Sequence, residues 1–489
     1  MSNQTETAEA TATASKRLTP LEKKWVMYDV GNSAFVLFAS TIIPIYFSSL
    51  AGNDSSGMAT SIWGAVSSIV ALLSLFICPI FGTMADFSGK KKFFLIFAGI
   101  GICGCVLLSL PFMTALLFAI VYIITDASLS SSCVFYDSML SDVTTEDRLH
   151  NVSANGYAWG YIGSCIPFIL CLALVLGVPN TVMPMQARMT ISFLITAGWW
   201  FAFTMPLAKN YKQHHFLDKP EHPIKDTFVR LGEIFKEVKE NKKAFLFLIA
   251  FFLYINGAYT IIKMATIYGQ DVLNLDSTQL LLALLLTQIV AFPSAIIIGR
   301  LSKKYEDKIL ITVCIVGYIA VSLFALFLKA QWQFWLLAFV VGCFQGGIQS
   351  LSRSYFTSII PYEKSGEYFG IYDIFGKGAG TLGPALVSGC VLIVNAITAK
   401  FPSFTNVTAV MNLDLIPVPL LTIAGAIVFY FVAKMPNPKF TTEEAVEETV
   451  EEVVEEPEME VEVVVEGEAI SDAPEMEVEV VVEDEVTED

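Results

Sequence analysis

Several acidic and basic side chains lie inside long apolar stretches of this sequence, where an ionised group is costly unless a partner compensates for it. These residues are Asp29, Asp126, Asp137, Lys263, Arg353, Asp373 and Lys377. Carboxylates at such places can carry protons or cations, and acid–base pairs between helices can form contacts that open and close. The sequence has no phosphate-binding glycine loop and no Cys and His spacing typical of zinc sites. We therefore expect neither an enzyme nor a bound metal or cofactor.

Asp126 is the deepest of these acids, close to the middle of an apolar run that covers about 115–139. Ser130, Cys133 and Asp137 follow it at helical spacing and would share one face with it. This placement suits proton or cation coupling, and we predict that role for Asp126. The alternative is a protonated acid that is hydrogen-bonded to a neighbouring helix.

Uncharged polar side chains on the same runs are candidates for contacts to a small polar solute. With one arginine, the candidate set is Asn32, Ser33, Asn155, Tyr157, Tyr161, Asn256, Thr260, Gln345, Gln349 and Arg353. Gln345, Gln349 and Arg353 are four residues apart, so they form one stripe on a helix. Lys263 is either a further solute contact or a side chain that extends to the outer surface.

A second set of charges falls in the half of each run that we expect to be cytoplasmic. It comprises Asp29, Asp137, Arg353, Asp373 and Lys377. Asp373 and Lys377 are an i, i+4 pair that can satisfy itself on one helix. The set is typical of a charge-pair gate on the inner side, and static helix packing is the other interpretation.

These residues need helices that cross a membrane. The chain has 489 residues, of which 54% are hydrophobic and 16% are charged. Apolar runs long enough to span a bilayer recur near 25–49, 59–84, 93–111, 115–139, 156–178, 187–207, 244–269, 279–300, 309–328, 333–359, 368–396 and 413–434. The sequence therefore predicts an all-α polytopic membrane protein with about twelve transmembrane helices.

Basic residues are concentrated in alternate loops. One set of segments holds Lys23 and Lys24, then Lys90 to Lys92, then 209–243, then 300–308. Cytoplasmic loops carry the excess of Lys and Arg in membrane proteins. We therefore expect both termini in the cytoplasm, and we expect the plasma (cell inner) membrane as the location.

The predicted organisation is a cytoplasmic N-terminal tail, two six-helix bundles, a linker and an acidic tail. The bounds are 1–22, 23–207, 208–243, 244–436 and 437–489, and the linker is expected to form an amphipathic helix over 226–243. No Lys or Arg follows Lys439, whereas 22 of the 47 acidic residues do. The net charge of −17 thus comes from the tail, and it indicates no nucleic-acid partner. A solvated tail and a docking site both remain open, and no partner of the tail is identified.

The stretch GTMADFSGKKK, from Gly82 to Lys92, resembles the loop between the second and third helices of the major facilitator superfamily. Gly82 would permit close helix contact and Gly89 a tight turn, followed by the basic Lys90. The resemblance implies that Asp86 faces the positive N-terminus of the eleventh span and latches the inner side. The alternative is an ordinary basic inside loop.

An ordered series of further motifs resembles the vacuole-effluxer family, the autophagy-related branch of that superfamily. The motifs are WVMYDVGNSAF (25–35), VFYDSMLSD (134–142), SANGYAWGYIGS (153–164), GWWFAFTMPL (198–207), FFLYINGAYTIIKMATIYG (251–269), FQGGIQSLSRSYFTSIIP (344–361) and EYFGIYDIFGKGAGTLGP (367–384). The resemblance implies export of amino acids, as associated with the fungal members. The family motif usually has Asp where this chain has Asn256, which implies a different mode of coupling if that acid carries protons elsewhere.

We therefore predict a secondary active transporter that moves a small polar solute, with amino acids as the first choice, by alternating access and with proton coupling. Its partners would be the small-molecule substrate, the lipid bilayer and protons. An exporter or importer of sugars, drugs or peptides is an alternative. A membrane scaffold or receptor that acts through the acidic tail is an alternative of a different class.

Overall fold

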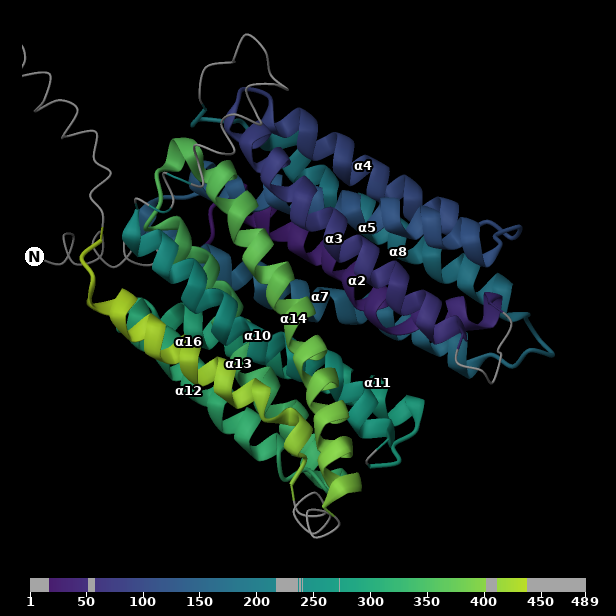
Figure 1. Ribbon diagram of the computed structural model, residues 1–489. Helices are drawn as coiled ribbons and strands as arrows, with labels where there is room; N and C mark the ends of the chain where they lie inside the picture. Colours follow the sequence, from purple (N-terminus) through teal and green to yellow (C-terminus); the bar gives the residue numbers. More distant parts are fainter. Residues whose placement is uncertain are drawn as a thin grey trace, which may run out of the picture. The chain divides into compact units, whose positions relative to one another are not determined.

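The computed structural model describes residues 17–51, 58–216, 236, 239, 241–271, 273–401 and 411–437. Within these ranges the chain forms twelve helices that are long and apolar enough to cross a membrane (Figure 1). The predicted all-α class and the twelve spans are confirmed. Most of the predicted N-terminal tail, most of the amphipathic helix at 226–243 and nearly all of the acidic tail lie outside the described residues.

The helices fall into an N-terminal half, which is described up to residue 216, and a C-terminal half, described from residue 241. The N-terminal half contains α2 (Pro20–Leu50), α3 (Met58–Asp86), α4 (Lys90–Leu108), α5 (Ala115–Ser138), α6 (Leu140–Val143), η1 (Glu146–Arg148), α7 (Leu149–Gly177) and α8 (Met185–Asn210). The C-terminal half contains α10 (Lys242–Asp271), α11 (Ser277–Leu301), α12 (Asp307–Ala325), α13 (Gln331–Thr357), η2 (Tyr362–Lys364), α14 (Ser365–Lys400), η4 (Leu413–Leu415) and α16 (Pro417–Lys434).

Two helices begin earlier than the apolar runs indicate. Helix α2 begins at Pro20 because Thr19 and Glu22 form a capping box, in which each side chain accepts a hydrogen bond from the other residue's backbone N–H. Helix α7 begins at Leu149 rather than near 156. The additional turns carry polar residues at one end of the helices. We call this the basic end, since it also carries the loops with Lys90 to Lys92 and with Lys303 and Lys304.

Each half has its own large hydrophobic core. Aromatic rings stack within both cores, for example Trp25 on Tyr136 at 4.4 Å and Phe251 on Tyr372 at 4.2 Å between ring centroids. Large apolar side chains also cover the outside, where Phe76 and Leu116 are more than two-thirds exposed. An outer surface of this kind is stable in lipid rather than in water.

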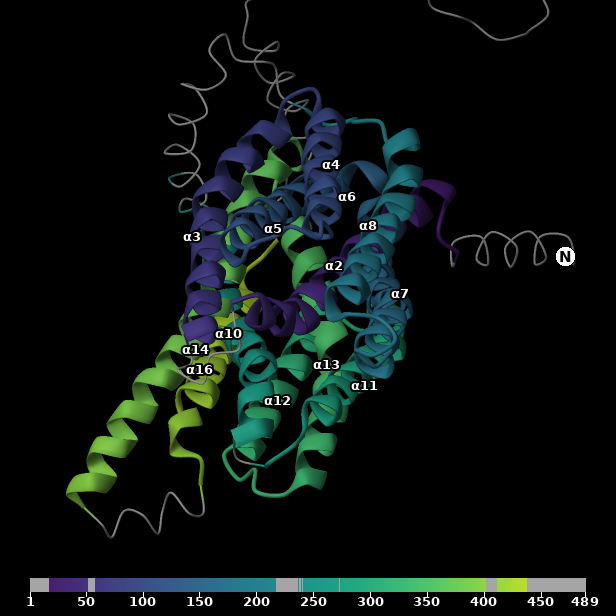
Figure 2. The same ribbon diagram turned by 90° about the vertical axis from the view of Figure 1, so that its right-hand side faces the viewer.

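The two halves meet along a small number of helix pairs. Helix α3 packs against α14, and α7 packs against α11 and α13. Figures 1 and 2 show the helices of the N-terminal half in purple to teal and those of the C-terminal half in teal-green to yellow, as two adjoining groups. Helices α3 and α14 cross closely at Gly82, where an added Cβ atom would lie 2.5 Å from the carbonyl oxygen of Gly366 and 2.9 Å from Cα of Gly370.

This crossing leads to a prediction for Gly82→Ala. The neighbouring atoms at Gly82 belong to the backbone of α14 and cannot rotate away, so the added methyl group should lower the free energy of unfolding by about 1–3 kcal/mol. Gly99→Ala on α4 is the matched control, because nothing lies within 4 Å of its added Cβ. Thermal unfolding in detergent measures both variants, and equal melting temperatures for Gly82→Ala and the wild type would contradict the prediction.

Candidate functional site

A buried arginine on α13 joins the two halves near the basic end. The guanidinium of Arg353 contacts two carboxylates of the N-terminal half, with Nη1 3.0 Å from Oδ1 of Asp137 and Nη2 3.4 Å from Oδ2 of Asp29. Arg353 is 2% exposed. A buried arginine needs such partners because its desolvation is otherwise uncompensated. We call Arg353, Asp29 and Asp137 the arginine cluster.

The N-terminal half completes the surroundings of this guanidinium. Arg353 donates hydrogen bonds from Nε to Oγ of Ser153, at 3.0 Å, and from Nη2 to the carbonyl oxygen of Ser153, at 3.1 Å. Its charge also lies over the rings of Tyr157 and Trp25, 4.2 and 4.8 Å from their centroids. Gly156 leaves room for it, since an added Cβ there would lie 2.9 Å from Nη2. Helices α2, α5 and α7 are thus tied to α13 through one side chain.

The other acid–base pair of the predicted gate lies on α14. Nζ of Lys377 is 3.0 Å from Oδ2 of Asp373 on the same helix, as the i, i+4 spacing predicts. Lys377 also lies 2.9 Å from Sγ of Cys78 on α3. The pair on α14 therefore makes its own contact with the N-terminal half.

Asp86 ends α3 against the first turn of α14. Its two carboxylate oxygens accept hydrogen bonds from the backbone N–H groups of Gly366, at 2.6 Å, and Glu367, at 2.7 Å. Asp86 is fully buried. A carboxylate at this place interacts favourably with the free N–H groups and positive end of the helix. The geometry implied by the loop motif is therefore present, and the latch role stays a prediction.

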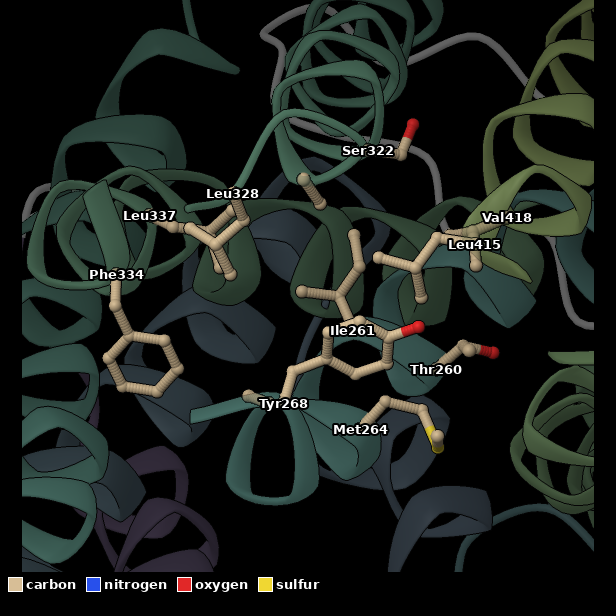
Figure 3. Close-up of a pocket in the computed structure, with 12 residues that line it drawn as sticks. Thr260, Ile261, Met264, Tyr268, Ser322, Leu328, Phe334, Leu337, Leu415 and Val418 are labelled. Atoms are coloured by element: carbon tan, nitrogen blue, oxygen red, sulfur yellow. The ribbon is translucent and has the colours of Figure 1, made fainter. Parts of the chain in front are cut away.

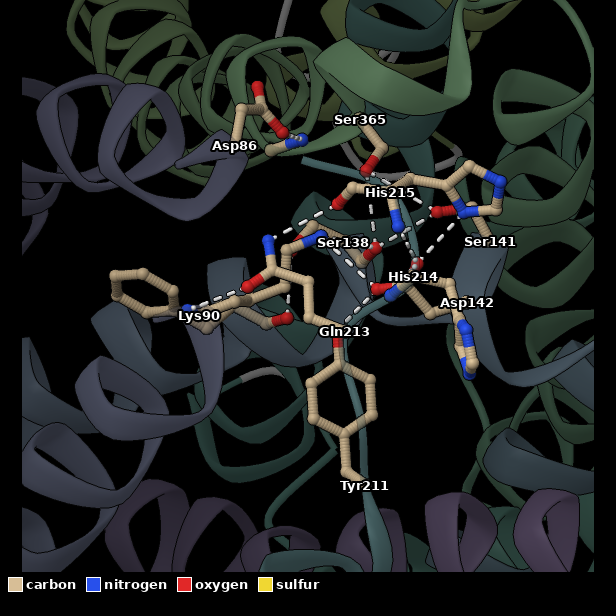
Figure 4. Close-up of polar contacts among 12 residues, drawn as sticks. Asp86, Lys90, Ser138, Ser141, Asp142, Tyr211, Gln213, His214, His215 and Ser365 are labelled. Atoms are coloured by element: carbon tan, nitrogen blue, oxygen red, sulfur yellow. Dashed lines mark hydrogen bonds and ion pairs between the residues drawn. The ribbon is translucent and has the colours of Figure 1, made fainter. Parts of the chain in front are cut away.

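Lys90 directs its charge into the N-terminal half rather than towards α14. Its fully buried Nζ donates to the carbonyl oxygen of Ser138, at 3.2 Å, and lies 3.6 Å from Oδ2 of Asp142 on α6. Gly89 precedes it with a φ of 112°, a conformation that glycine adopts most readily. Figure 4 shows these residues close to Ser365, whose Oγ also donates to the carbonyl oxygen of Ser138, at 3.2 Å.

Asp142 organises this region, and the sequence reasoning did not identify it. It accepts hydrogen bonds from the hydroxyl of Tyr211 and from the backbone N–H groups of His214 and His215 (Figure 4). Burial on its own raises the pKa of Asp142, but the charge of Lys90 and these hydrogen bonds outweigh it, so the pKa lies below the usual 3.8. Burial and the adjoining carboxylate raise the pKa of Tyr211. The clue in the sequence was an acid in a short polar stretch after the fourth span.

His150 is a second residue that the sequence analysis did not identify. It lies in the first turn of α7, in the segment that extends beyond the apolar run. Its Nδ1 is 2.7 Å from Oγ of Ser354 on α13, and its Nε2 is 2.6 Å from Oδ2 of Asp307 on α12. His150 therefore adds a further polar contact between the halves at the basic end.

The predicted solute contacts lie in different environments. The hydroxyl of Tyr161 donates to Gln349 across the two halves. Asn155 donates to the carbonyl oxygen of Asn151 on its own helix, at 2.8 Å. Ser33 packs against α7, because a Cβ at Gly160 would lie 2.9 Å from its Oγ. In this conformation α7 therefore faces several of the candidates.

Asn256 and Thr260 are fully buried between α10 and α14, and Thr260 donates to Oδ1 of Asn256 at 3.2 Å. They pack against Gly383. Three polar atoms of the candidate set are buried and have no hydrogen-bond partner among the described residues: Nδ2 of Asn32, Nδ2 of Asn256 and Oε1 of Gln345. Unpaired buried groups of this kind are the ones that gain most from a bound polar solute.

Asp126 and Lys263 lie further from the basic end than the arginine cluster. Asp126 is only partly buried, although it sits in the middle of α5. Lys263 is exposed and donates from Nζ to the carbonyl oxygen of Gly380 on α14, at 2.7 Å, so both interpretations of its role stay open.

A separate cavity lies within the C-terminal half (Figure 3). Its lining is mostly apolar and includes Ile261, Tyr268, Leu415 and Val418, with Thr260 at one side. Its volume of about 30 Å³ holds one or two water molecules. The cavity is too small for a metabolite, and none of its lining residues belongs to the arginine cluster. No group of His, Cys, Asp and Glu within the described ranges could hold a metal ion.

Comparisons with known proteins identify relatives of the whole helical region. A family model described as vacuole effluxer Atg22 like matches residues 56–425. The uncharacterized MFS-type transporter YxiO of Bacillus subtilis is 39% identical over 424 residues, which cover 85% of this chain and 96% of YxiO. Autophagy-related protein 22 of Yarrowia lipolytica is 27% identical over 297 residues, 53% of this chain and 50% of its own. The chain thus spans about half the length of this fungal relative.

Solved structures with the same fold are transporters rather than enzymes. The Escherichia coli fucose:proton symporter FucP aligns with a TM-score of 0.60 and 12% identity, covering 85% of this chain and 98% of that chain. The human organic anion transporter MFSD10 aligns with a TM-score of 0.62 and 10% identity, covering 84% and 98%. At these identities the likeness shows the major facilitator fold alone.

The arginine cluster leads to a double-mutant prediction. Arg353→Ala leaves Asp29 and Asp137 buried without their cation and should lower the free energy of unfolding by about 3–5 kcal/mol. Asp137→Ala should also destabilise, and the double variant should lose less than the sum of the two by about 0.5–3 kcal/mol. Thermal unfolding measures all three. Lys308→Ala, which removes an exposed pair with Glu306, is the control and should change nothing measurable. If the loss in the double variant equals the sum of the losses in the two single variants, the predicted interaction between Arg353 and Asp137 is contradicted.

The lowered pKa of Asp142 leads to a prediction about pH. An acid whose pKa falls on folding stabilises the protein above its usual pKa, and this contribution disappears as the pH falls through the folded-state pKa. Asp142→Asn should therefore lower the free energy of unfolding by about 1.5–3 kcal/mol at neutral pH. The difference in stability between the variant and the wild type should shrink below pH 3.8. Melting temperatures across this range measure it, with the exposed Asp147→Asn as control. A pH-independent difference would exclude the ionised form as the cause.

Proposed function

The chain belongs to the vacuole effluxer Atg22-like family of membrane transporters, and on this premise we propose that it moves amino acids across the membrane by proton-coupled alternating access. The observation that carries the proposal is the arginine cluster, a buried polar contact between the two halves at the basic end. A set of charges that joins the two halves at one end is suited to a gate, because the paired groups must separate before a solute can leave at that end.

The gate would have three parts. The arginine cluster ties α13 to α2, α5 and α7, Asp86 holds the first turn of α14, and the Asp373–Lys377 pair meets α3 at Cys78. Gly82 permits the close crossing that brings α3 and α14 together. We propose that these contacts break together when the halves, 23–207 and 244–436, rock apart at the basic end. In this proposal the basic end faces the cytoplasm, as the loop charges predict.

The solute would bind between the halves, beyond the arginine cluster. Asn32, Gln345 and Asn256 offer buried polar atoms without partners among the described residues, and Tyr161 with Gln349 bridges the two halves nearby. Amides and hydroxyls together suit an amphipathic solute with both donor and acceptor groups. Asn256 and Thr260 would become accessible only if α10 and α14 separate, because both are fully buried between them.

Asp126 is the proposed proton carrier. It lies in the middle of α5 and is partly accessible. A partly accessible carboxylate within a membrane span is the usual type of residue for proton coupling. We place the protein in the plasma membrane, since the relative that matches over 96% of its own length is bacterial.

Uptake into proteoliposomes tests this proposal. We expect the purified protein to transport at least one of the twenty L-amino acids, with a rate that depends on an imposed pH gradient. Asp126→Asn should abolish the dependence on the gradient, whereas Asp147→Asn, at an exposed residue of η1, should leave it unchanged. If the folded protein transports sugars but no amino acid, amino acids are excluded as its substrate class. Unaltered gradient dependence in Asp126→Asn would remove Asp126 from the coupling.

A further inference from the structure

His150, in the first turn of α7, contacts two helices of the C-terminal half, one through each ring nitrogen. Its Nδ1 is 2.7 Å from Oγ of Ser354 on α13, and its Nε2 is 2.6 Å from Oδ2 of Asp307, the first residue of α12. The side chains of His150 and Asp307 are 16% and 22% exposed. Protons can therefore reach this contact from the solution at the basic end while the halves are together.

Both neighbours of the imidazole ring accept hydrogen bonds. An ionised Asp307 carboxylate has no proton to donate. The single hydroxyl proton of Ser354 is directed to the carbonyl oxygens of Ser350 and Leu351, at 2.9 and 3.3 Å, so its oxygen is left to accept from the ring. A neutral imidazole carries a proton on one nitrogen only and can donate to one of these groups but not to both. The geometry is therefore that of a protonated His150, with an N–H group on each side.

Asp307 depends on this proton as well. Its Oδ1 is buried and has no hydrogen-bond partner among the described residues, and its Oδ2 pairs with His150. Loss of the proton would leave a partly buried carboxylate beside a neutral ring, which is unfavourable because nothing then balances its charge.

The elements around this contact carry other charged or titratable groups: Glu146, Asp147 and Arg148 of η1, Glu22 of α2, Arg300 of α11, Glu306 and Lys308 at the start of α12, and Arg353 and Tyr355 of α13. Arg148 pairs with Glu22, at 2.7 Å, within the N-terminal half, and Lys308 pairs with Glu306, at 2.8 Å, within the C-terminal half. Arg353 keeps its charge at any physiological pH. Separation of the halves therefore leaves the first two pairs as they are, whereas it breaks the contact of His150.

A series of hydrogen bonds leads from His150 to the arginine cluster. The carbonyl oxygen of Ser350, which accepts from Ser354, also accepts from Oγ of Ser153 on α7, at 2.9 Å. Oγ of Ser153 accepts in turn from Nε of Arg353, at 3.0 Å. The histidine and the buried guanidinium thus belong to one network where the two halves meet.

We propose that His150 and Asp307 form a proton-binding site that holds the halves together at the basic end and is separate from the proton carrier Asp126. The inference rests on the proposed alternating access and adds a regulation of it by the pH on the side of the basic end. The closed conformation holds the proton between two acceptors, and a separated His150 loses both, so the proton binds more tightly to the closed state. Lowering the pH through the range in which imidazole titrates therefore raises the closed population, and this contribution is lost as the pH rises.

The distance between the two halves at the basic end, measured at two pH values, tests this site. Lys92 on α4 and Lys304 after α11 are exposed and belong to different halves. Spin labels attached there through a ketone-bearing amino acid avoid the nine cysteines of the chain. Double electron–electron resonance on the full chain in lipid nanodiscs gives the fractions with short and long distances. From about pH 8 to about pH 6, we expect the ratio of short to long distances to rise about threefold to tenfold, the difference between a neutral and a charge-assisted hydrogen bond.

His150→Gln and Asp307→Asn keep hydrogen-bonding side chains but remove the ion pair, so each should lose most of this rise. His214→Gln is the matched control and should keep the wild-type response, because His214 is exposed and, within the described part of the chain, contributes only its backbone N–H to Asp142. Melting temperatures confirm folding, and either of the two site variants suffices if the other does not fold.

The outcomes separate this site from the proposed transport mechanism. Two distances whose ratio does not change with pH in the wild type, or changes as strongly in the site variants, would overturn the proton-binding site and leave alternating access standing. A single distance in every protein, at both pH values and with each of the twenty L-amino acids, would contradict alternating access as well.

Discussion

The contact of Arg353 with Asp29 and Asp137 is the interaction on which the arrangement of the two halves depends. A guanidinium can stay in a dry environment only when carboxylates and aromatic faces replace the water around it, and here the other half of the protein supplies most of these groups. Separating the halves at this end therefore exposes a cation and two anions together. Water has to reach all three before the separated state becomes stable.

The other contacts at the basic end are weaker individually. Asp86 accepts two backbone hydrogen bonds from α14, and His150 lies between Ser354 and Asp307. A net contribution of about 0.5–1.5 kcal/mol for a typical hydrogen bond means that no one of these contacts fixes the conformation. Alternating access needs two states that differ by only a few kcal/mol. A set of modest contacts around one buried ion cluster is compatible with that balance.

Much of the fold was predictable from the sequence because lipid imposes a length on each apolar run and leaves the helix as the simplest way to satisfy its backbone. Depth could also be counted along a helix, which grouped Asp29, Asp137 and Arg353 before their contacts were known. It was harder to predict which part of each helix face a neighbouring helix covers. Asn256 and Thr260 share a face with Lys263, as the spacing predicts, but spacing does not say that α14 covers the first two and leaves the third accessible. The contacts of Lys90 and His150 were not predicted for a related reason, since their partners Asp142 and Asp307 belong to segments far away in the sequence.

The partner of Asp86 is the main chain of α14 rather than a side chain. Every residue except proline supplies the same N–H group, so a replacement at Glu367 would keep that donor. At Gly366 an added Cβ would lie 2.5 Å from the carbonyl oxygen of Gly82 and 2.8 Å from Oδ1 of Asp86, so a larger residue there would disturb the contact. Asp86 cannot be replaced in the same way, because its carboxylate accepts both hydrogen bonds. Substitutions that loosen this contact are therefore expected at Asp86 and at the glycines that bring the helices close, Gly82 and Gly366, rather than at Glu367.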